Sequence, residues 1–263
     1  LLESENMMQK IEVVQIPCLS DNYGYLVHHV SSGETASIDT PDAAPLLATL
    51  ADRKWELTAI YNTHHHYDHV GGNLELKEKT GCKIFGPAGE ADKIPGLDEA
   101  LDDGDMISLG SEQIRILNVG GHTKGHIAYY FFESSCAFVG DTLFMLGCGR
   151  LFEGTPQQMW SSLKKIANLP PETLIYCAHE YTEANARFAE TIDPDNKNLT
   201  KRIADIKALR SADKPTVPAS IAVELATNPF LRAGDPAIQN HLGMAGANIV
   251  DVFAEIRTLK DNY

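Results

Sequence analysis

Short hydrophobic runs bounded by Gly, Asp or Ser dominate the chain up to about residue 143. Because these runs are rich in Val, Ile, Phe and Tyr, they are typical of β-strands. We expect strands at residues 12–17, 25–29, 36–39, 59–62, 83–85, 113–119, 127–132, 137–139 and 173–178. Helical patterns interrupt them at 44–52 and 73–80. A third helix is predicted to begin at Thr155, because Thr155-Pro156-Gln157-Gln158 has the order of a capping box with Pro at the first helical position.

From about residue 182 onward, the pattern of hydrophobic positions becomes helical. Helices are predicted at 183–191, 199–210, 219–226 and 247–260, separated by Pro, Asn and Asp. The sequence therefore predicts an α/β domain over residues 8–180 and a smaller all-helical domain over 181–263. A chain of 263 residues is long enough for one large core with a smaller appended domain. Residues 1–6 are left out of this predicted fold.

Composition narrows the classes of function. The chain is 43% hydrophobic and 22% charged, as in ordinary soluble proteins, and no apolar stretch approaches the ~20 residues of a membrane helix. The first ten residues do not resemble a signal or transit peptide. A net charge of −14 argues against nucleic acid as a partner. Five cysteines without a Cys-x-x-Cys pair favour a reducing compartment, so we expect a cytoplasmic protein with no membrane partner.

The run Thr63-His64-His65-His66-Tyr67-Asp68-His69 directly follows the predicted strand at 59–62. In an extended backbone, residues two apart project to the same side, so His64 and His66 can converge on one metal ion. Asp68 and His69 are expected in the same loop. Four histidines and an aspartate within seven residues predict a metal site rather than a plain surface loop.

Three further residues of ligand type lie just beyond hydrophobic runs: His122, Asp141 and His179. Sheet-based enzymes gather their active-site groups at such positions. A lone His or Asp there is usually a cap or a turn residue, but four such loops together predict one site.

Neighbouring residues receive other interpretations. His65 has the wrong phase to be a ligand, and His126 is expected to form a hydrogen bond to a ligand residue. Asp39 is either an acceptor for a ligand imidazole or a turn-forming residue. Cys177 lies two residues before His179 and is interpreted as a core residue.

The order Thr63-His64-x-His66-x-Asp68-His69, then His122, Asp141 and His179, resembles the metallo-β-lactamase superfamily. Within it, the chain resembles the glyoxalase II (hydroxyacylglutathione hydrolase) family from about residue 8 to residue 263. The motifs that carry this resemblance are Gly140-Asp141-Thr142-Leu143-Phe144, Gly147-Cys148-Gly149-Arg150, His179-Glu180-Tyr181-Thr182 and Asn228-Pro229-Phe230. The resemblance implies an α/β fold, an αββα sandwich of the metallo-β-lactamase type followed by the helical domain.

The resemblance also implies a centre with two divalent metal ions. One ion is expected on His64, His66 and His122, and the other on Asp68, His69 and His179. Asp141 is expected to bridge the ions together with a water or hydroxide. The catalytic residues are then Asp141, Asp68 and His69. Zinc is the expected metal, with iron and manganese as alternatives, because imidazole and carboxylate ligands suit all three.

Members of the family hydrolyse S-D-lactoylglutathione to D-lactate and glutathione, a step of methylglyoxal detoxification, by attack of the bridging hydroxide on the thioester carbonyl. The leaving thiol has a pKa of ~8.5–9, so it needs little help from a general acid. The resemblance places Arg150, Tyr181, Arg257 and Lys260 at glutathione-contacting positions. Arg257 and Lys260 share one face of the last predicted helix. The alternative interpretation is that they do not bind substrate and are simply two cations at a helix C-terminus, where positive charge is favourable.

One residue departs from the family pattern. Phe152 stands where some members have a Tyr that forms a hydrogen bond to glutathione. We therefore expect this chain to lack that hydrogen bond and to bind glutathione with modestly lower affinity. The chain is expected to act as a monomer.

Other functions remain as alternatives. A persulfide dioxygenase with a single iron shares much of the histidine pattern, but the helical tail does not fit it. Phosphodiesterases and tRNA-processing nucleases share the metal motif, but this acidic chain lacks a basic stripe. A class B β-lactamase is exported and usually has a Cys ligand, which Asp141 and His179 fit poorly. A non-catalytic metal-binding module is the alternative outside the enzymes.

Overall fold

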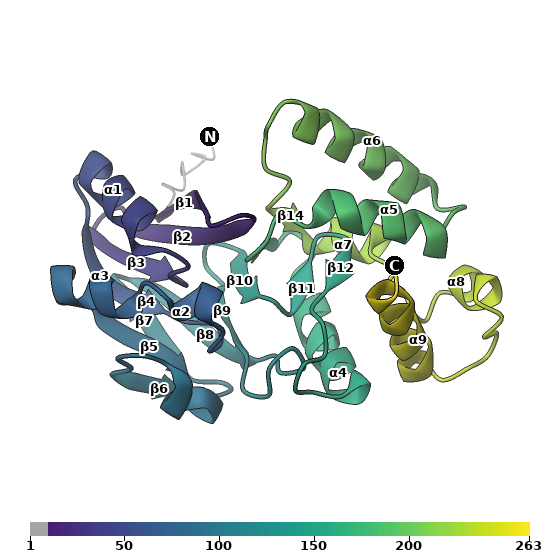
Figure 1. Cartoon of the computed structure of the whole chain (residues 1–263), viewed down its shortest axis with the longest axis horizontal. Helices are drawn as coiled ribbons and strands as arrows, with labels where there is room; N and C mark the ends of the chain where they lie inside the picture. Colours follow the sequence, from purple (N-terminus) through teal and green to yellow (C-terminus); the bar gives the residue numbers. More distant parts are fainter. Residues whose placement is uncertain (1–9) are drawn as a thin grey trace, which may run out of the picture.

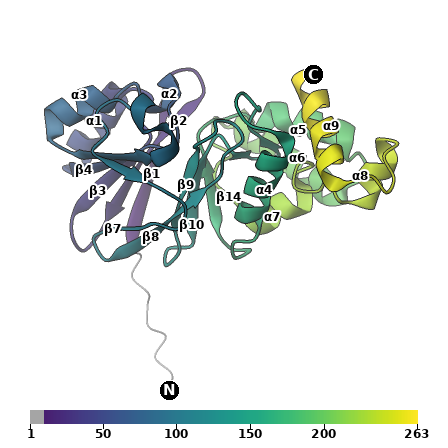
Figure 2. The same cartoon turned by 90° about the horizontal axis from the view of Figure 1, so that it is seen from below.

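Two six-stranded sheets pack face to face, and helices lie outside both of them (Figure 1, Figure 2). The computed structural model describes residues 10–263, so residues 1–6 and the start of the predicted domain at residue 8 lie outside the described residues. The first sheet has the order β1 (Ile11–Cys18), β2 (Asn22–His29), β3 (Glu34–Ile38), β4 (Glu56–Tyr61), β5 (Lys83–Pro87) and β6 (Glu99–Leu101). The second has the order β14 (Ala219–Ser220), β13 (Leu174–Cys177), β10 (Cys136–Gly140), β9 (Ile127–Phe131), β8 (Glu112–Asn118) and β7 (Met106–Leu109). A separate hairpin joins β11 (Leu143–Phe144) to β12 (Gly147–Cys148).

The helices come from two parts of the chain. The first part of the chain contributes α1 (Ala43–Arg53), α2 (Tyr67–Val70), α3 (Asn73–Thr80) and the 3-10 helix η1 (Ala88–Lys93). The remainder contributes α4 (Pro156–Ala167), α5 (Thr182–Ile192), α6 (Lys197–Ser211), α7 (Ile221–Thr227), α8 (Pro236–His241) and α9 (Ile249–Asp261). Figure 2 shows α1 and α3 beyond the first sheet, and α4 with the C-terminal helices beyond the second. None of the helices within residues 10–263 is long and apolar enough to cross a membrane.

Alternating side chains of the first sheet bury both of its faces. Leu26 and Ile60 pack outward in one core cluster with Leu46 of α1. Their neighbours Tyr25 and Tyr61 point inward, into the core shared with the second sheet. This alternation is the period-two pattern of a strand, and burying both faces is what makes the layered arrangement stable.

Strand direction brings loops from both sheets to one edge. β3, β4, β5 and β6 are parallel, and β8, β10 and β13 also run in one direction. At their carboxyl ends the sheets are joined, because the N–H of Tyr23 donates to the carbonyl of Ala178 (2.7 Å) and that of Ile127 donates to Thr63 (3.0 Å). The segments after β3, β4 and β5 therefore face those after β8, β10 and β13.

The predicted αββα order and C-terminal helices are confirmed, and so is the capping of α4, where the Thr155 side chain accepts the N–H of Gln158. Some details were wrong. Asp68 and His69 lie in the single helical turn α2 rather than in a loop, and the helix predicted from residue 219 begins at Ile221. The short elements β6, β7, β11, β12, β14, η1 and α8 were not predicted, because a few residues carry no visible period. The domain boundary at residue 180 stays a prediction.

Candidate metal centre

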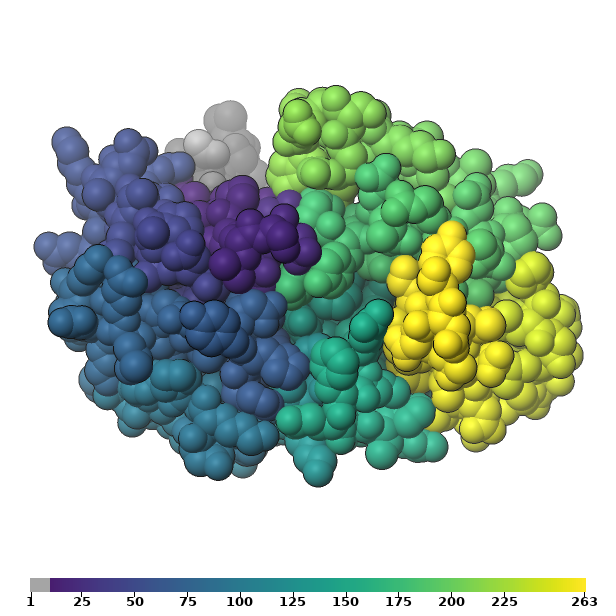
Figure 3. Space-filling view, viewed as in Figure 1, coloured from purple at the N-terminus to yellow at the C-terminus, as the bar shows by residue number. Residues whose placement is uncertain are grey.

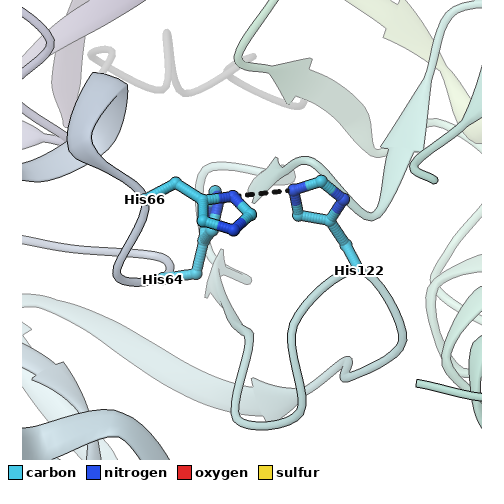
Figure 4. Close-up of side chains that lie close together, drawn as sticks. All are labelled: His64, His66 and His122. Carbon is cyan, nitrogen blue, oxygen red and sulfur yellow. Dashed lines mark hydrogen bonds between the residues drawn. The ribbon is translucent and has the colours of Figure 1, made fainter. Parts of the chain in front are cut away.

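The first cluster of the centre consists of three imidazoles from two loops (Figure 4). His64 and His66 follow β4, and His122 follows β8. The Nδ1 atom of His66 lies 3.0 Å from Nε2 of His64 and 3.1 Å from Nε2 of His122. Three nitrogen atoms that converge in this way can hold one metal ion.

The second cluster combines a carboxylate with two imidazoles. Oδ2 of Asp68 lies 3.6 Å from Nε2 of His69 and 3.5 Å from Nε2 of His179. Asp68 and His69 are close because α2 begins directly after His66, and His179 arrives from the end of β13. This is a second group with the composition of a metal site.

The carboxylate of Asp141 lies between the two clusters. Its Oδ1 is 3.5 Å from Nε2 of His69 and 3.4 Å from Nε2 of His179, while its Oδ2 is 3.4 Å from Nε2 of His122. The preceding Gly140 has φ +49°, and a Cβ there would lie 2.6 Å from the Thr63 hydroxyl oxygen, so only glycine fits this turn. Each oxygen of Asp141 thus faces a different cluster.

The second ring nitrogen of four of these histidines is held from behind. Nδ1 of His69 lies 2.7 Å from Asp39, and Nδ1 of His179 lies 2.7 Å from Asp21. Nδ1 of His122 lies 2.9 Å from the carbonyl oxygen of Arg150, and Nδ1 of His64 lies 3.0 Å from the Thr63 hydroxyl. Such contacts fix the orientation of an imidazole and increase its basicity as a ligand.

The charges of the site follow from burial and from Asp141. Burial lowers the pKa of His64, His66 and His122, which favours the neutral imidazole that binds metals. Burial also acts against the ionised form of Asp141, but the imidazoles of His179 and His69 outweigh it and hold the pKa of Asp141 well below its ordinary value.

Two atoms of the site indicate that the donors suit a metal. Nε2 of His69 and Oδ1 of Asp141 are buried and have no hydrogen-bond partner among the described residues. Buried polar atoms of folded proteins are almost always paired, so an orphaned nitrogen beside an orphaned oxygen fits a site that holds a cation. Imidazole nitrogen and carboxylate oxygen together fit divalent zinc, iron or manganese.

A cavity of about 510 Å³ opens above the clusters. It is lined by five of the ligand-type residues and by further residues, among them Phe144, Phe152, Tyr181, Arg150, Arg257 and Lys260. Figure 3 shows the C-terminal helix α9, in yellow, on the same face as the teal segment around residue 150. Phe152 is 62% exposed, and its ring centre lies 5.2 Å from that of His122. The cavity is therefore lined both by metal-type donors and by cations.

The two cations of α9, Arg257 and Lys260, differ in how firmly their side chains are held by neighbouring residues. Arg257 is only 5% exposed, donates from Nη1 to the carbonyl oxygen of Cys148 (2.8 Å) and pairs through Nη2 with Asp261 (2.9 Å). Nζ of Lys260 donates to the carbonyl of Ala184 (3.4 Å). Burial, followed by the neighbouring Arg257, Arg187 and Arg150, lowers the pKa of Lys260 to about 8.

Comparison with known proteins gives the family. Residues 32–179 match the family model described as Metallo-beta-lactamase superfamily, and residues 180–263 match Hydroxyacylglutathione hydrolase C-terminus. A hydroxyacylglutathione hydrolase of Hyphomonas neptunium is 56% identical over 253 residues, covering 96% of this chain and 98% of the relative. The corresponding protein of Cereibacter sphaeroides is 54% identical, covering 96% of this chain and 99% of the relative. The chain belongs to the hydroxyacylglutathione hydrolase family.

Other members of the metallo-β-lactamase superfamily share the fold of this hydroxyacylglutathione hydrolase family member. The crystal structure of the BLEG-1 B3 metallo-β-lactamase aligns with this chain with a TM-score of 0.66 at 20% sequence identity. The alignment covers 84% of this chain and 99% of the β-lactamase chain. The predicted family and fold are thus confirmed. The persulfide dioxygenase alternative is not favoured, because relatives that match nearly the whole chain are named as hydrolases.

The seven residues predicted as metal ligands in this family member meet in one place. His65 and His126 behave differently from them: His65 contacts Glu90, and Nε2 of His126 accepts the N–H of Asp141 (3.1 Å). Cys177 is fully buried in the core, as its apolar neighbours suggested. Asp21 and Glu90 could not be predicted from the sequence, because neither lies in a recognisable motif.

Proposed function

We propose that this protein hydrolyses the thioester of S-D-lactoylglutathione to D-lactate and glutathione. The observation that carries the proposal is the position of Asp141, whose two oxygens face the two clusters beside a cavity that is also lined by cations. His64, His66 and His122 would hold one ion. Asp68, His69 and His179 would hold the second, and Asp141 would be shared.

Two divalent cations held there supply Lewis-acid polarisation of the thioester carbonyl and a water of lowered pKa. The chain contributes orientation and charge. Asp141 stays ionised at neutral pH because His179 and His69 hold its pKa low despite burial. Asp39 and Asp21 hold the rings of His69 and His179 in place from behind. These contacts orient two of the donor imidazoles for the ions that the site would hold.

The cation-lined half of the cavity fits the glutathione part of the substrate. Glutathione carries two carboxylates, and Arg150, Arg257 and Lys260 line the cavity on the side of α9. Tyr181 stacks on His179, with ring centres 4.6 Å apart, and can form a wall near the reacting group. These residues support binding of the glutathione carboxylates by the cations while the thioester carbonyl lies at the two clusters.

We also propose zinc as the resident metal, a monomeric state and a cytoplasmic location. The ligand set supports zinc as well as iron and manganese. All five cysteines are buried and unpaired in the described structure, which supports a reducing compartment.

The proposal is tested by hydrolysis of S-D-lactoylglutathione, measured by thioester absorbance on metal-replete protein. The matched control substrate carries the lactoyl group on a small thiol without carboxylates. We expect hydrolysis of the glutathione thioester with a higher kcat/KM than the control. Equal kcat/KM values would contradict the role of glutathione. Absence of thioester hydrolysis with both metal equivalents bound would contradict the enzyme assignment and favour a binding module.

A further inference from the structure

Glu90 is a buried carboxylate that joins two ligand-bearing loops and belongs to neither metal cluster. Its side chain is only 1% exposed. Oε2 accepts the backbone N–H of His65 (3.0 Å) and lies 2.7 Å from Nδ1 of the same residue. Oε1 accepts the backbone N–H of Gly125 (2.9 Å). One carboxylate therefore holds the loop of His64 and His66 and the loop of His122.

The topology explains how Glu90 reaches both loops. It lies in η1, directly after β5, and β4 and β5 are parallel neighbours. The segment after β5 therefore lies beside the segment after β4, which carries His64 to His66. The loop after β8 comes from the facing sheet, and Gly125 lies in it three residues after His122.

Gly125 allows this close contact. A Cβ at Gly125 would lie 2.7 Å from Cγ of Glu90 and 3.0 Å from the backbone of Gly89. Any larger residue would push η1 away from the His122 loop. The missing side chain at Gly125 thus lets the carboxylate reach the backbone N–H.

A second carboxylate supports the same arrangement. Oε1 of Glu153 lies 3.6 Å from Nε2 of His65, and its Oε2 accepts the backbone N–H of Lys124 (2.9 Å). His65 is therefore flanked by two acidic side chains, each of which also binds the backbone of the His122 loop. This explains why His65 points away from the metal-type donors on either side of it.

We propose that Glu90 is a positioning residue for the metal ion that His64, His66 and His122 would hold. By fixing the backbone and ring of His65, it sets the separation of the two ligand side chains on either side. By binding Gly125, it sets the distance from these two to His122. Metal sites need their donors held within about 0.5 Å of the productive geometry, and residues outside the ligand set usually supply this accuracy. The inference rests on the metal assignment of the proposed function, and not on its substrate.

The test is a metal titration of the purified full chain against a chromophoric chelator, with zinc as the probe. In Glu90→Ala, we expect one of the two zinc equivalents to bind about 10- to 100-fold more weakly. Glu90→Gln keeps the shape of the side chain and one acceptor oxygen, so it should lose less zinc affinity than Glu90→Ala. Asp92→Asn changes an exposed acid of the same 3-10 helix and should bind both equivalents as the wild type does.

The visible spectrum of the Co²⁺-loaded protein should change in Glu90→Ala and Glu90→Gln but not in Asp92→Asn.

Single-cluster backgrounds identify which equivalent is affected. In a His179→Ala protein, adding Glu90→Gln should weaken the remaining equivalent, whereas in a His122→Ala protein it should not. Wild-type affinity for both equivalents in Glu90→Ala would overturn the inference. Equal weakening of both equivalents would also overturn it, because a merely structural role predicts that result. If Glu90→Ala does not fold, Glu90→Gln decides by the same criteria.

The two proposals fail separately. A wild-type chain that binds two equivalents without thioester hydrolysis would contradict the proposed function, while the chelator titration would still decide the role of Glu90. A wild-type chain that binds no metal would overturn the positioning role itself.

Discussion

Asp39 supports His69 from the side opposite the metal cluster: its Oδ2 lies 2.7 Å from Nδ1 of the imidazole. The same carboxylate accepts the backbone N–H (2.8 Å) and the hydroxyl (2.8 Å) of Thr63, directly before His64. One side chain at the end of β3 thus orients a residue of the second cluster and the start of the loop that carries the first. This relationship decides between the two interpretations that the sequence left open for Asp39.

Replacement of Asp39 should weaken metal binding without unfolding the chain. Asp39 has φ +54°, a conformation that Asn tolerates, so Asp39→Asn removes the charge with little backbone strain. We expect a loss of metal affinity of about 10- to 100-fold. Chelator competition measures it, with the exposed Asp52→Asn on α1 as the control. Unchanged metal affinity in Asp39→Asn would contradict the supporting role.

Lys260 should make substrate binding dependent on pH. Its pKa is about 8, lowered first by burial and then by Arg257 and other cations, so it is charged below pH 8 and neutral above. KM for the glutathione thioester should therefore rise as pH increases through about 8. Steady-state kinetics from pH 6 to pH 9 should show that Lys260→Arg removes this rise.

Truncation of the same side chain gives a second check. Lys260→Ala should raise KM by about tenfold, the worth of one charge-assisted hydrogen bond, with a smaller effect on kcat because the contact is remote from the reacting carbonyl. The exposed Lys207→Ala on α6 is the control. An unchanged KM in Lys260→Ala would remove this residue from the substrate site.

Asp261 is expected to oppose substrate binding. Its carboxylate lies 2.9 Å from Nη2 of Arg257 and 3.7 Å from Nε of Arg150, so it partly neutralises two cations of the cavity. Asp261→Asn should lower KM for the glutathione thioester, whose glutathione part carries two carboxylates, about threefold, and the effect should shrink with added salt. Asp251→Asn, at the other end of α9, should not change KM. A raised KM in Asp261→Asn would show that the carboxylate assists binding instead.

Asn228 is expected to stabilise the fold around the β11–β12 hairpin. Its buried amide donates to the carbonyl oxygens of Phe144 (3.1 Å) and Gly147 (3.0 Å) and accepts the N–H of Phe230 (3.0 Å). Asn228→Ala leaves these groups buried without partners and should lower the free energy of unfolding by about 2–4 kcal/mol. Urea denaturation measures it, and the exposed Asn240→Ala is the control. A loss below about 0.5 kcal/mol, the usual range of surface changes, would contradict this role.

Local sequence pattern and family resemblance were enough to predict much of the fold and the candidate ligands. Contacts between segments far apart in the sequence could not be predicted in this way. His64 and His66 could be predicted because two residues of an extended chain share one side, and β4 and β10 because their hydrophobic runs are continuous. Asp21 could not, because it lies 158 residues from His179 and only pairing between the sheets brings them together. Glu90 was equally invisible: its contacts depend on the parallel order of β4 and β5.

The proposed function depends above all on Asp141, which would be shared between two metal ions that act together on a thioester. Asp141→Asn tests it most directly, by thioester hydrolysis and zinc stoichiometry measured on the same preparation. We expect the variant to retain its fold, to bind at most one zinc equivalent with wild-type affinity, and to have a kcat lower by at least about 100-fold. A variant with wild-type kcat and two tightly bound equivalents would contradict it.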